Sequence, residues 1–353
     1  MTQSITYRVG FDVAKTVFQV HGVKNEPGEA VAITRRLRRA QVEPFFAKLP
    51  PSLIGIEACG SAHYWARLAR KHGHEVRLMP PAYVKAYVKR NKTDAHDAAA
   101  ICEAVARPTM RFVAIKSEAD QATLMLHRLR ASFVEKRTAA ANQLRAAFAE
   151  FGITVAVGAG GFKELLGLIE SKAESFTLLP QALRLVLCEL AWQWQSCEAA
   201  VRRMDVEIAA GVKRSERAKR LTEVPSIGPV GASAIDALLP DPQLFRSGRD
   251  FAAWVGLTPR EDSTGKTVKR GPITKKGDGY LRRLLVLGAT SYLARVRRGQ
   301  AKGASAWALK MAAHPKRKLA AVALANKTAR VAWAMLAKGE DYRAPAAAAL
   351  QAA

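Results

Sequence analysis

Residues 7–24, YRVGFDVAKTVFQVHGVK, decide the fold of the N-terminal part of the chain. Apolar and polar side chains alternate along this stretch, and β-branched and aromatic residues are frequent, which is typical of strands. The pattern predicts two short strands over residues 7–13 and 16–23, joined by a tight turn at residues 14–15. We therefore expect the chain to open with a β-hairpin.

The segments that follow continue a mixed α/β pattern. In chain order they are predicted as strand 30–34, helix 35–49, strand 52–57, helix 63–71, strand 75–79 and helix 93–106. Proline pairs at 50–51 and 80–81 interrupt the chain between these elements. Three strands followed by helix, strand, helix, strand and helix is the order of elements in a ribonuclease H-like domain.

Two long helices are predicted in the middle of the chain. The first runs from residue 117 to about 152, and a Gly- and Ala-rich segment, 153–161, separates it from the second. Apolar residues of the second helix recur at alternating spacings of four and three, which is a heptad pattern. They are Leu183, Leu187, Leu190, Trp194, Cys197, Val201, Met204 and Ile208. This seam fits both packing within one chain and dimerisation through a coiled coil.

A third region begins after the charged run at residues 213–220. It contains VPSIGPVGASAI, residues 224–235, which is typical of two helices joined by a Gly-containing turn. Backbone N–H groups at such a helix start can bind a DNA phosphate, and a turn between two core helices fits the pattern equally. The predicted fold class is therefore α/β plus α. Its expected parts are 1–108, a helical coiled-coil connector 109–220, a mainly α domain 221–342 and a flexible tail 343–353.

The net charge of the chain indicates the class of molecule that it binds. The chain has 56 Lys and Arg residues against 30 Asp and Glu residues, which gives a net charge of +26. Clustered cations gain affinity for polyanions because they release the counterions condensed on phosphates. Nucleic acid is the leading candidate, and a protein that is basic throughout without such a partner is the alternative.

The sequence gives no support for a membrane protein, a secreted protein or a protein built around cysteine-bound zinc. No stretch approaches the roughly 20 apolar residues of a membrane span, and the N-terminus lacks the features of a secretion signal. We therefore expect a cytoplasmic protein. The four cysteines form no CxxC pair, which argues against a zinc site and a disulfide framework.

Four carboxylates are candidate functional groups: two lie in apolar strands, where an ionised group is costly, and two share one face of a helix. Asp12 interrupts the apolar run of the first strand, and Glu57 ends the apolar run of the strand expected beside it. Asp94 and Asp97, three residues apart, share one face at the start of the helix 93–106. Singly, Asp94 could be a helix cap and Asp97 a solvated residue. Together the four predict an Mg²⁺ site for phosphoryl transfer, because hard oxygen ligands converge there.

Several short motifs, taken in order, resemble one family. They are GFDVAK, IGIEACG, KTDAHDA, SIGPVGASAI, FAAWVGLTPR, DSTGK and GPITKKGDGYLRR. In this order and spacing the chain resembles, over nearly its whole length, the DEDD transposases of the insertion-sequence 110/1111 family, which includes the Piv-type DNA invertases.

The resemblance implies a RuvC-like catalytic domain, a coiled-coil connection and a C-terminal transposase domain. The family's Asp-Glu-Asp-Asp set falls on Asp12, Glu57, Asp94 and Asp97. The resemblance also implies recombination between donor and target DNA, guided in several relatives by a structured non-coding RNA, and a serine that becomes covalently linked to DNA.

That serine matches Ser263, and Thr264 is the alternative hydroxyl. On residue type alone, a Ser in such a Gly-containing loop is a turn residue. Basic side chains follow closely and could neutralise a phosphate under attack. They are Lys266, Lys269, Arg270, Lys275, Lys276, Arg282 and Arg283. A phosphate-binding loop without a nucleophile is the plainer interpretation of this cluster.

The leading hypothesis is an RNA-guided DNA transposase, nucleoid-associated, in which Mg²⁺ on the four carboxylates activates Ser263. Since about two hundred residues separate Ser263 from the acids, the site could be assembled within one chain or between chains of a homodimer or homotetramer. The first alternative is a RuvC-like nuclease that activates water. The second is a nucleic-acid-binding protein without catalysis, which would have no use for the four acids.

Overall fold

The computed structural model describes residues 5–26, 28, 30–88, 93–265, 267–301 and 303–344. Most of the tail expected over 343–353 therefore lies outside the described residues. The chain divides into two compact units. The first consists of the described residues of Met1–Gln121 together with Leu239–Arg246, and the second of Ala122–Leu238 with those of Ser247–Ala353.

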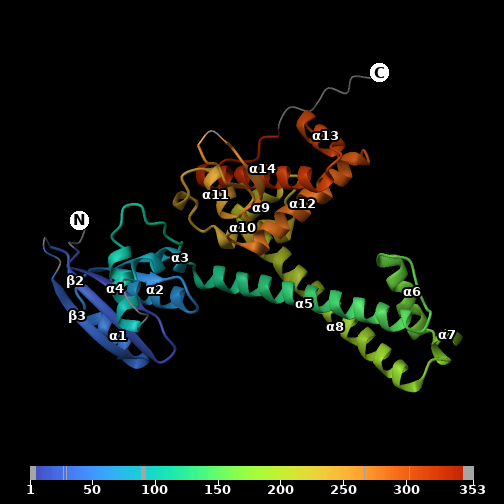
Figure 1. The fold of residues 1–353 in the computed structure, drawn as a ribbon, viewed down its shortest axis with the longest axis horizontal. Helices are drawn as coiled ribbons and strands as arrows, with labels where there is room; N and C mark the ends of the chain where they lie inside the picture. The colour runs from blue at the N-terminus through green and yellow to red at the C-terminus, as the bar shows by residue number, and fades with distance from the viewer. Residues whose placement is uncertain are drawn as a thin grey trace. The chain divides into compact units, whose positions relative to one another are not determined.

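A five-stranded sheet forms the centre of the first unit (Figure 1). Its strands are β1 (Tyr7–Asp12), β2 (Val17–Lys24), β3 (Val31–Arg38), β4 (Ser52–Glu57) and β5 (Glu75–Met79). The order across the sheet is β3-β2-β1-β4-β5, with β2 antiparallel to both β1 and β3. β4 runs parallel to β1, and β5 runs parallel to β4. The parallel strands β4 and β5 are joined by α2 (Ala62–Lys71).

Helices cover both faces of this sheet. On one face, Phe11 and Phe18 pack in a core with Phe46 of α1 (Arg39–Lys48) and Trp65 of α2. On the other face lies α4 (Asp94–Ala104), which packs on β1 and β2. α3 (Pro81–Val84) and a short 3-10 helix (Lys85–Tyr87) precede α4. Successive side chains of a strand point to opposite faces, so the neighbours of Phe11 point toward α4.

One boundary differs from the sequence prediction. The helix expected over residues 35–49 begins only at Arg39, and residues 35–38 extend β3 instead. The cause is cross-strand pairing, since β3 pairs with β2 as far as the Val17–Arg38 pair. Arginine has no intrinsic preference strong enough to oppose such pairing, so the longer edge strand forms.

Two long helices, α5 (Glu118–Ala149) and α8 (Gln181–Arg214), lie side by side in the second unit, to which α5 belongs from Ala122 onward. α6 (Ala159–Glu170) and α7 (Glu174–Thr177) lie at one end of the pair (Figure 1). Arg137 of α5 pairs with Glu198 of α8. The sequence predicted the long helices, whereas the Gly- and Ala-rich segment between them gave no sign of α6.

The heptad positions of α8 are used within the chain. Leu187 is fully buried in a core that also holds Leu144 and Phe148 of α5. Val201 and Ile208 are buried as well. Of the two uses left open for this seam, packing between helices of one chain accounts for these buried positions.

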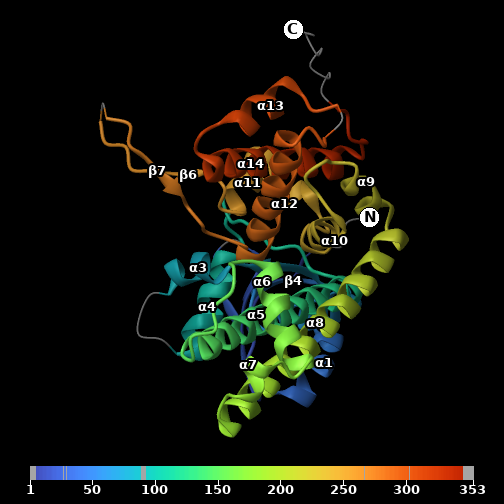
Figure 2. The ribbon, with the colours of Figure 1, turned by 90° about the vertical axis from the view of Figure 1, so that its right-hand side faces the viewer.

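Six further helices of the described residues, all shorter than α5 and α8, form most of the rest of the second unit. They are α9 (Glu216–Thr222), α10 (Pro229–Leu238), α11 (Gly248–Trp254), α12 (Gly279–Arg297), α13 (Ala306–Ala313) and α14 (Arg317–Lys338). α12 and α14 pack together, and a hairpin of β6 (Pro259–Glu261) and β7 (Arg270–Ile273) projects from the helices of this unit (Figure 2). Within the described residues, none of the helices is long and apolar enough to span a membrane.

Candidate functional site

The end of β1 and the start of α4 carry the candidate metal-binding residues. Asp12 is the last residue of β1. Thr93 stands just before α4 in an extended conformation, and its hydroxyl accepts a hydrogen bond of 3.3 Å from the backbone N–H of His96. This N-cap fixes where the helix begins, and it places Asp94 and Asp97 on the first turn. The first turn of α4 therefore presents two carboxylates toward the end of β1.

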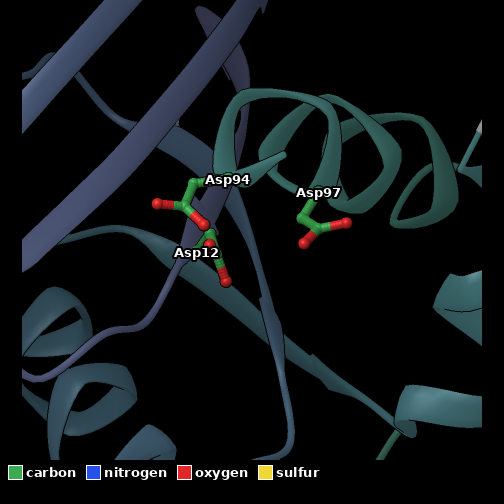
Figure 3. Close-up of side chains that lie close together, drawn as sticks. All are labelled: Asp12, Asp94 and Asp97. Atoms are coloured by element: carbon green, nitrogen blue, oxygen red, sulfur yellow. The ribbon is translucent and has the colours of Figure 1, made fainter. Parts of the chain in front are cut away.

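Three of the four predicted acids come together. Asp12, Asp94 and Asp97 each offer a carboxylate oxygen, and these oxygens lie within 4.8 Å of one another (Figure 3). Asp12 and Asp97 are half-buried and Asp94 is exposed. Two ligands on opposite sides of an Mg²⁺ ion lie about 4.2 Å apart, since each Mg–O bond is about 2.1 Å. The spacing of the oxygens thus fits a shared divalent cation.

Glu57 is level with Asp12 but outside this group of three. The last pair of the parallel β1–β4 ladder is Phe11 with Ile56, so Glu57 follows on β4 beside Asp12 on β1. Both carboxylates act on the Cys59 thiol, whose pKa is raised first by burial and then by the charges of Glu57 and Asp12. The raised pKa keeps this thiol protonated at neutral pH.

Gly10 sets the distance between β1 and α4. A Cβ atom at Gly10 would lie 2.0 Å from the carbonyl oxygen of Ala98 and 2.5 Å from the backbone nitrogen of Cys102. Cys102 also donates a hydrogen bond of 3.2 Å from Sγ to the carbonyl oxygen of Arg8. The helix backbone can approach the strand this closely only because residue 10 has no side chain. An isolated glycine inside a strand is the signal that predicts such an approach.

Ser263 belongs to the second unit, in the loop between β6 and β7. It is exposed, and the loop around it is held by backbone hydrogen bonds between Thr264 and Thr267 of 3.2 and 3.0 Å. The Asp262 N–H donates to the carbonyl oxygen of Lys269 at 3.0 Å. The paired Thr264 and Thr267 close the end of the hairpin, and Ser263 directly precedes this pair.

The basic residues around this hairpin fall into two groups. Lys269, Arg270, Lys275 and Lys276 are exposed, and Lys266 lies outside the described residues. Arg282 donates to the carbonyl oxygens of Val255 and Lys276 at 2.8 and 3.2 Å, while Arg283 lies 3.3 Å from Glu135 of α5. The first group is open to a phosphate, whereas Arg282 and Arg283 make contacts within the protein.

A buried histidine that the sequence did not single out connects three helices of the second unit. His127 of α5 is 1% exposed; its Nδ1 lies 3.0 Å from the Tyr280 hydroxyl and its Nε2 lies 3.1 Å from the Ser233 hydroxyl. Burial, and to a smaller extent the nearby Arg130 charge, lower its pKa to about 4. Tyr280 is the second residue of α12, so a neutral His127 holds the start of that helix against α5.

Two family models match the chain. One, described as a transposase of the DEDD type found in IS110, covers residues 9–153, and the other, described as the transposase IS116/IS110/IS902 family, covers residues 218–304. The first match includes all four predicted acids, and the second includes Ser263.

Curated relatives agree over nearly the full length. A putative transposase of Sinorhizobium fredii is 44% identical over 95% of this chain and 85% of its own length. A probable family 20 transposase of Pseudomonas aeruginosa is 46% identical, over 95% and 98%. The transposase for insertion sequence element IS1111A of Coxiella burnetii is 36% identical, over 95% and 91%. The chain therefore belongs to the IS110/IS1111 family of insertion-sequence transposases.

Proposed function

We propose that this transposase cuts and rejoins DNA by metal-dependent phosphoryl transfer at the carboxylates of its first unit, with Ser263 as the nucleophile. The observation that supports the proposal most is the approach of the Asp12, Asp94 and Asp97 oxygens to within 4.8 Å of one another. Three carboxylates so close repel one another unless a cation is shared. A protein that only binds nucleic acid gains nothing from such an arrangement.

The ion proposed is Mg²⁺, held by Asp12, Asp94 and Asp97, with Glu57 beside them on β4. When bound, it supplies charge neutralisation at the scissile phosphate and lowers the pKa of an attacking hydroxyl. The chain positions the carboxylates through the end of β1, the Thr93 cap and the close packing that Gly10 allows.

Ser263 is proposed to attack a phosphorus atom of the DNA backbone. A bond forms between Ser263 Oγ and phosphorus while the bond from phosphorus to the leaving nucleotide oxygen breaks. The hydroxyl proton passes to solvent, and the departing oxygen takes up a proton from solvent, so the charges balance. Exposed Lys269 and Arg270 on the same hairpin can bind the phosphate during this step. The covalent phosphoserine preserves the phosphodiester for rejoining.

The test of the metal site uses substitutions that remove charge with almost no change in volume. Asp12→Asn and Asp97→Asn should abolish strand cleavage in Mg²⁺ while DNA affinity and melting temperature stay near those of the parent. Glu75→Gln on β5 is the matched control, because Glu75 is an exposed carboxylate of the same sheet that pairs with Arg77. Undiminished cleavage in both Asp variants would refute the proposal.

A covalent adduct separates the transposase from a RuvC-like nuclease that activates water. That nuclease is the second candidate, because the three clustered carboxylates belong to one unit and Ser263 to the other. Ser263→Ala should prevent a covalent protein–DNA species, whereas Thr264→Val should not. An adduct that persists in Ser263→Ala would assign the attack to Thr264. Full cleavage without any adduct would favour the nuclease.

We also propose an RNase H-like, RuvC-like fold for residues 1–108, a helical connector over 109–220 and a transposase domain over 221–342. The sheet order β3-β2-β1-β4-β5 with an acid at the end of β1 supports the first of these. A guide RNA and a homodimer or homotetramer are part of the same proposal. Co-purification of a defined RNA that nuclease treatment removes, and the mass of the complex by light scattering, test these two points.

A further inference from the structure

The strand register places an arginine in line with the carboxylate cluster. Asp12 of β1 pairs with Gln19 of β2, and Gln19 pairs with Arg36 of β3. Residues directly opposite one another on neighbouring strands point to the same face of a sheet. Asp12, Gln19 and Arg36 therefore form a row across the face on which α4 lies.

Alternation along β3 places a second arginine on the same face. Arg36 and Arg38 are both exposed, while Leu37 between them is 8% exposed and packs in the core on the opposite face. β3 is the edge strand, and α4 packs on the two strands next to it, β1 and β2. This face of the sheet thus carries acids beside α4 and exposed arginines at its edge.

These arginines are open to an anionic ligand. Within the described residues, no ion pair to a carboxylate involves Arg36 or Arg38. Strands lie about 4.8 Å apart, so the backbone at Arg36 is about 10 Å from that at Asp12. An arginine side chain there is well placed for a phosphate next to the one at the acids. Guanidinium groups bind phosphate through paired N–H donors, which makes phosphate the ligand they fit best.

We propose that Arg36 and Arg38 form a phosphate-binding track on β3 that holds the backbone of the DNA strand leading to Asp12. The proposal rests on the proposed function in one respect, the position of the cut at the carboxylates. The competing explanation is that charged residues on an edge strand only prevent strand-to-strand aggregation. That explanation assigns no greater role to the arginines on the α4 face than to Arg35.

Arg35 provides a matched control on the same strand. It is exposed like its neighbours, but it points to the face of Leu37 and lines a groove with Phe45 and Leu49. Removing Arg35 changes the net charge as much as removing Arg36 does. Only the face of the sheet differs between the two variants.

The experiment measures the affinity of the full-length chain for a mixed-sequence single-stranded DNA oligonucleotide as a function of salt, in EDTA so that no cleavage occurs. Each lost phosphate contact reduces the slope of log K against log salt by about 0.7. Arg36→Ala should reduce the slope by about 0.7 and Arg36→Ala with Arg38→Ala by about 1.4, whereas Arg35→Ala should not change it. Arg36→Lys with Arg38→Lys should keep most of the parent slope. Melting temperatures check that the variants are folded, and Gln substitutions replace Ala if they are not.

The track is refuted if the double Ala variant keeps the parent slope, or if Arg35→Ala reduces the slope as much as Arg36→Ala does. Cleavage by Asp12→Asn in Mg²⁺ is scored separately. A loss of slope with normal cleavage by Asp12→Asn would retain the track and refute the proposed function. A normal slope in the double Ala variant with no cleavage by Asp12→Asn would refute the track and retain the proposed function.

Discussion

Gly10→Ala should disable the carboxylate cluster without touching a carboxylate. The new Cβ would lie 2.0 Å from the Ala98 carbonyl oxygen, whereas ordinary contact begins at 3.4 Å, so α4 must withdraw by about 1.4 Å. Asp94 and Asp97 lie on the same helix and move with it, while Asp12 stays on β1. Metal sites tolerate about 0.2 Å in ligand distance, and a displacement of about 1 Å can cost about 100-fold in rate.

We therefore expect Gly10→Ala to weaken Mn²⁺ binding and to lower strand cleavage by about 100-fold, at a cost of about 1–3 kcal/mol in the free energy of unfolding. Calorimetric Mn²⁺ titration and a gel assay of cleavage measure the two effects. Gly22→Ala is the control, because the three atoms nearest to its Cβ belong to the Ile33 side chain on the neighbouring strand β3, the first of them at 3.0 Å. Parent-like Mn²⁺ affinity and cleavage in Gly10→Ala would refute the idea that this close approach positions the acids.

Three further predictions concern the helices. Burial lowers the pKa of His127 from 6.5 to about 4, so the unfolded chain takes up the proton first and the free energy of unfolding falls by about 3 kcal/mol as pH drops from about 6.5 to 4. In urea unfolding at pH 7.5 and pH 5, His127→Gln should lack the part of the pH-dependent loss that His127 causes. The same pH dependence in His127→Gln and the parent would contradict this prediction. Leu187→Asp should lower the free energy of unfolding by more than about 3 kcal/mol, because Leu187 is fully buried. Trp192→Asp, at a site 63% exposed on the same helix, should leave the melting temperature nearly unchanged. Equal melting temperatures of the two variants would show that the heptad positions do not form a core. Thr93→Ala should cost about 1 kcal/mol by removing the α4 cap and should weaken Mn²⁺ binding, and equal affinity by titration would count against a role of the cap in the site.

The sequence predicted the elements of the first unit because buried strands leave a clear mark. Alternation in β1 and β2 and the apolar run of β4 are local signals, and an acid inside such a run is conspicuous. Asp12 could therefore be selected from its strand, and Asp94 and Asp97 from their shared face at the start of a helix, before the structure placed the three together. Glu57 was selected for the same reason as Asp12, and it lies beside Asp12 on the next strand, outside the group of three.

Features that depend on distant partners could not be predicted. The segment 35–38, which contains three arginines, carries no strand signal of its own, and only pairing with β2 makes it a strand. His127 has partners 153 and 106 residues away, so nothing near it in the chain indicates that it is buried. The heptad pattern of α8 shows which residues form a seam but not whether the partner helix belongs to the same chain.

Metal binding by the full-length chain tests the central claim most directly, because it needs neither DNA nor cleavage. Titration with Mn²⁺, followed by electron paramagnetic resonance of the free ion, should give at least one site in the parent chain and in Glu75→Gln. Asp12→Asn and Asp97→Asn should each lose that site while keeping the parent melting temperature, since a ligand charge is removed from the cluster of three. Equal Mn²⁺ binding by the parent and both Asp variants would contradict the account.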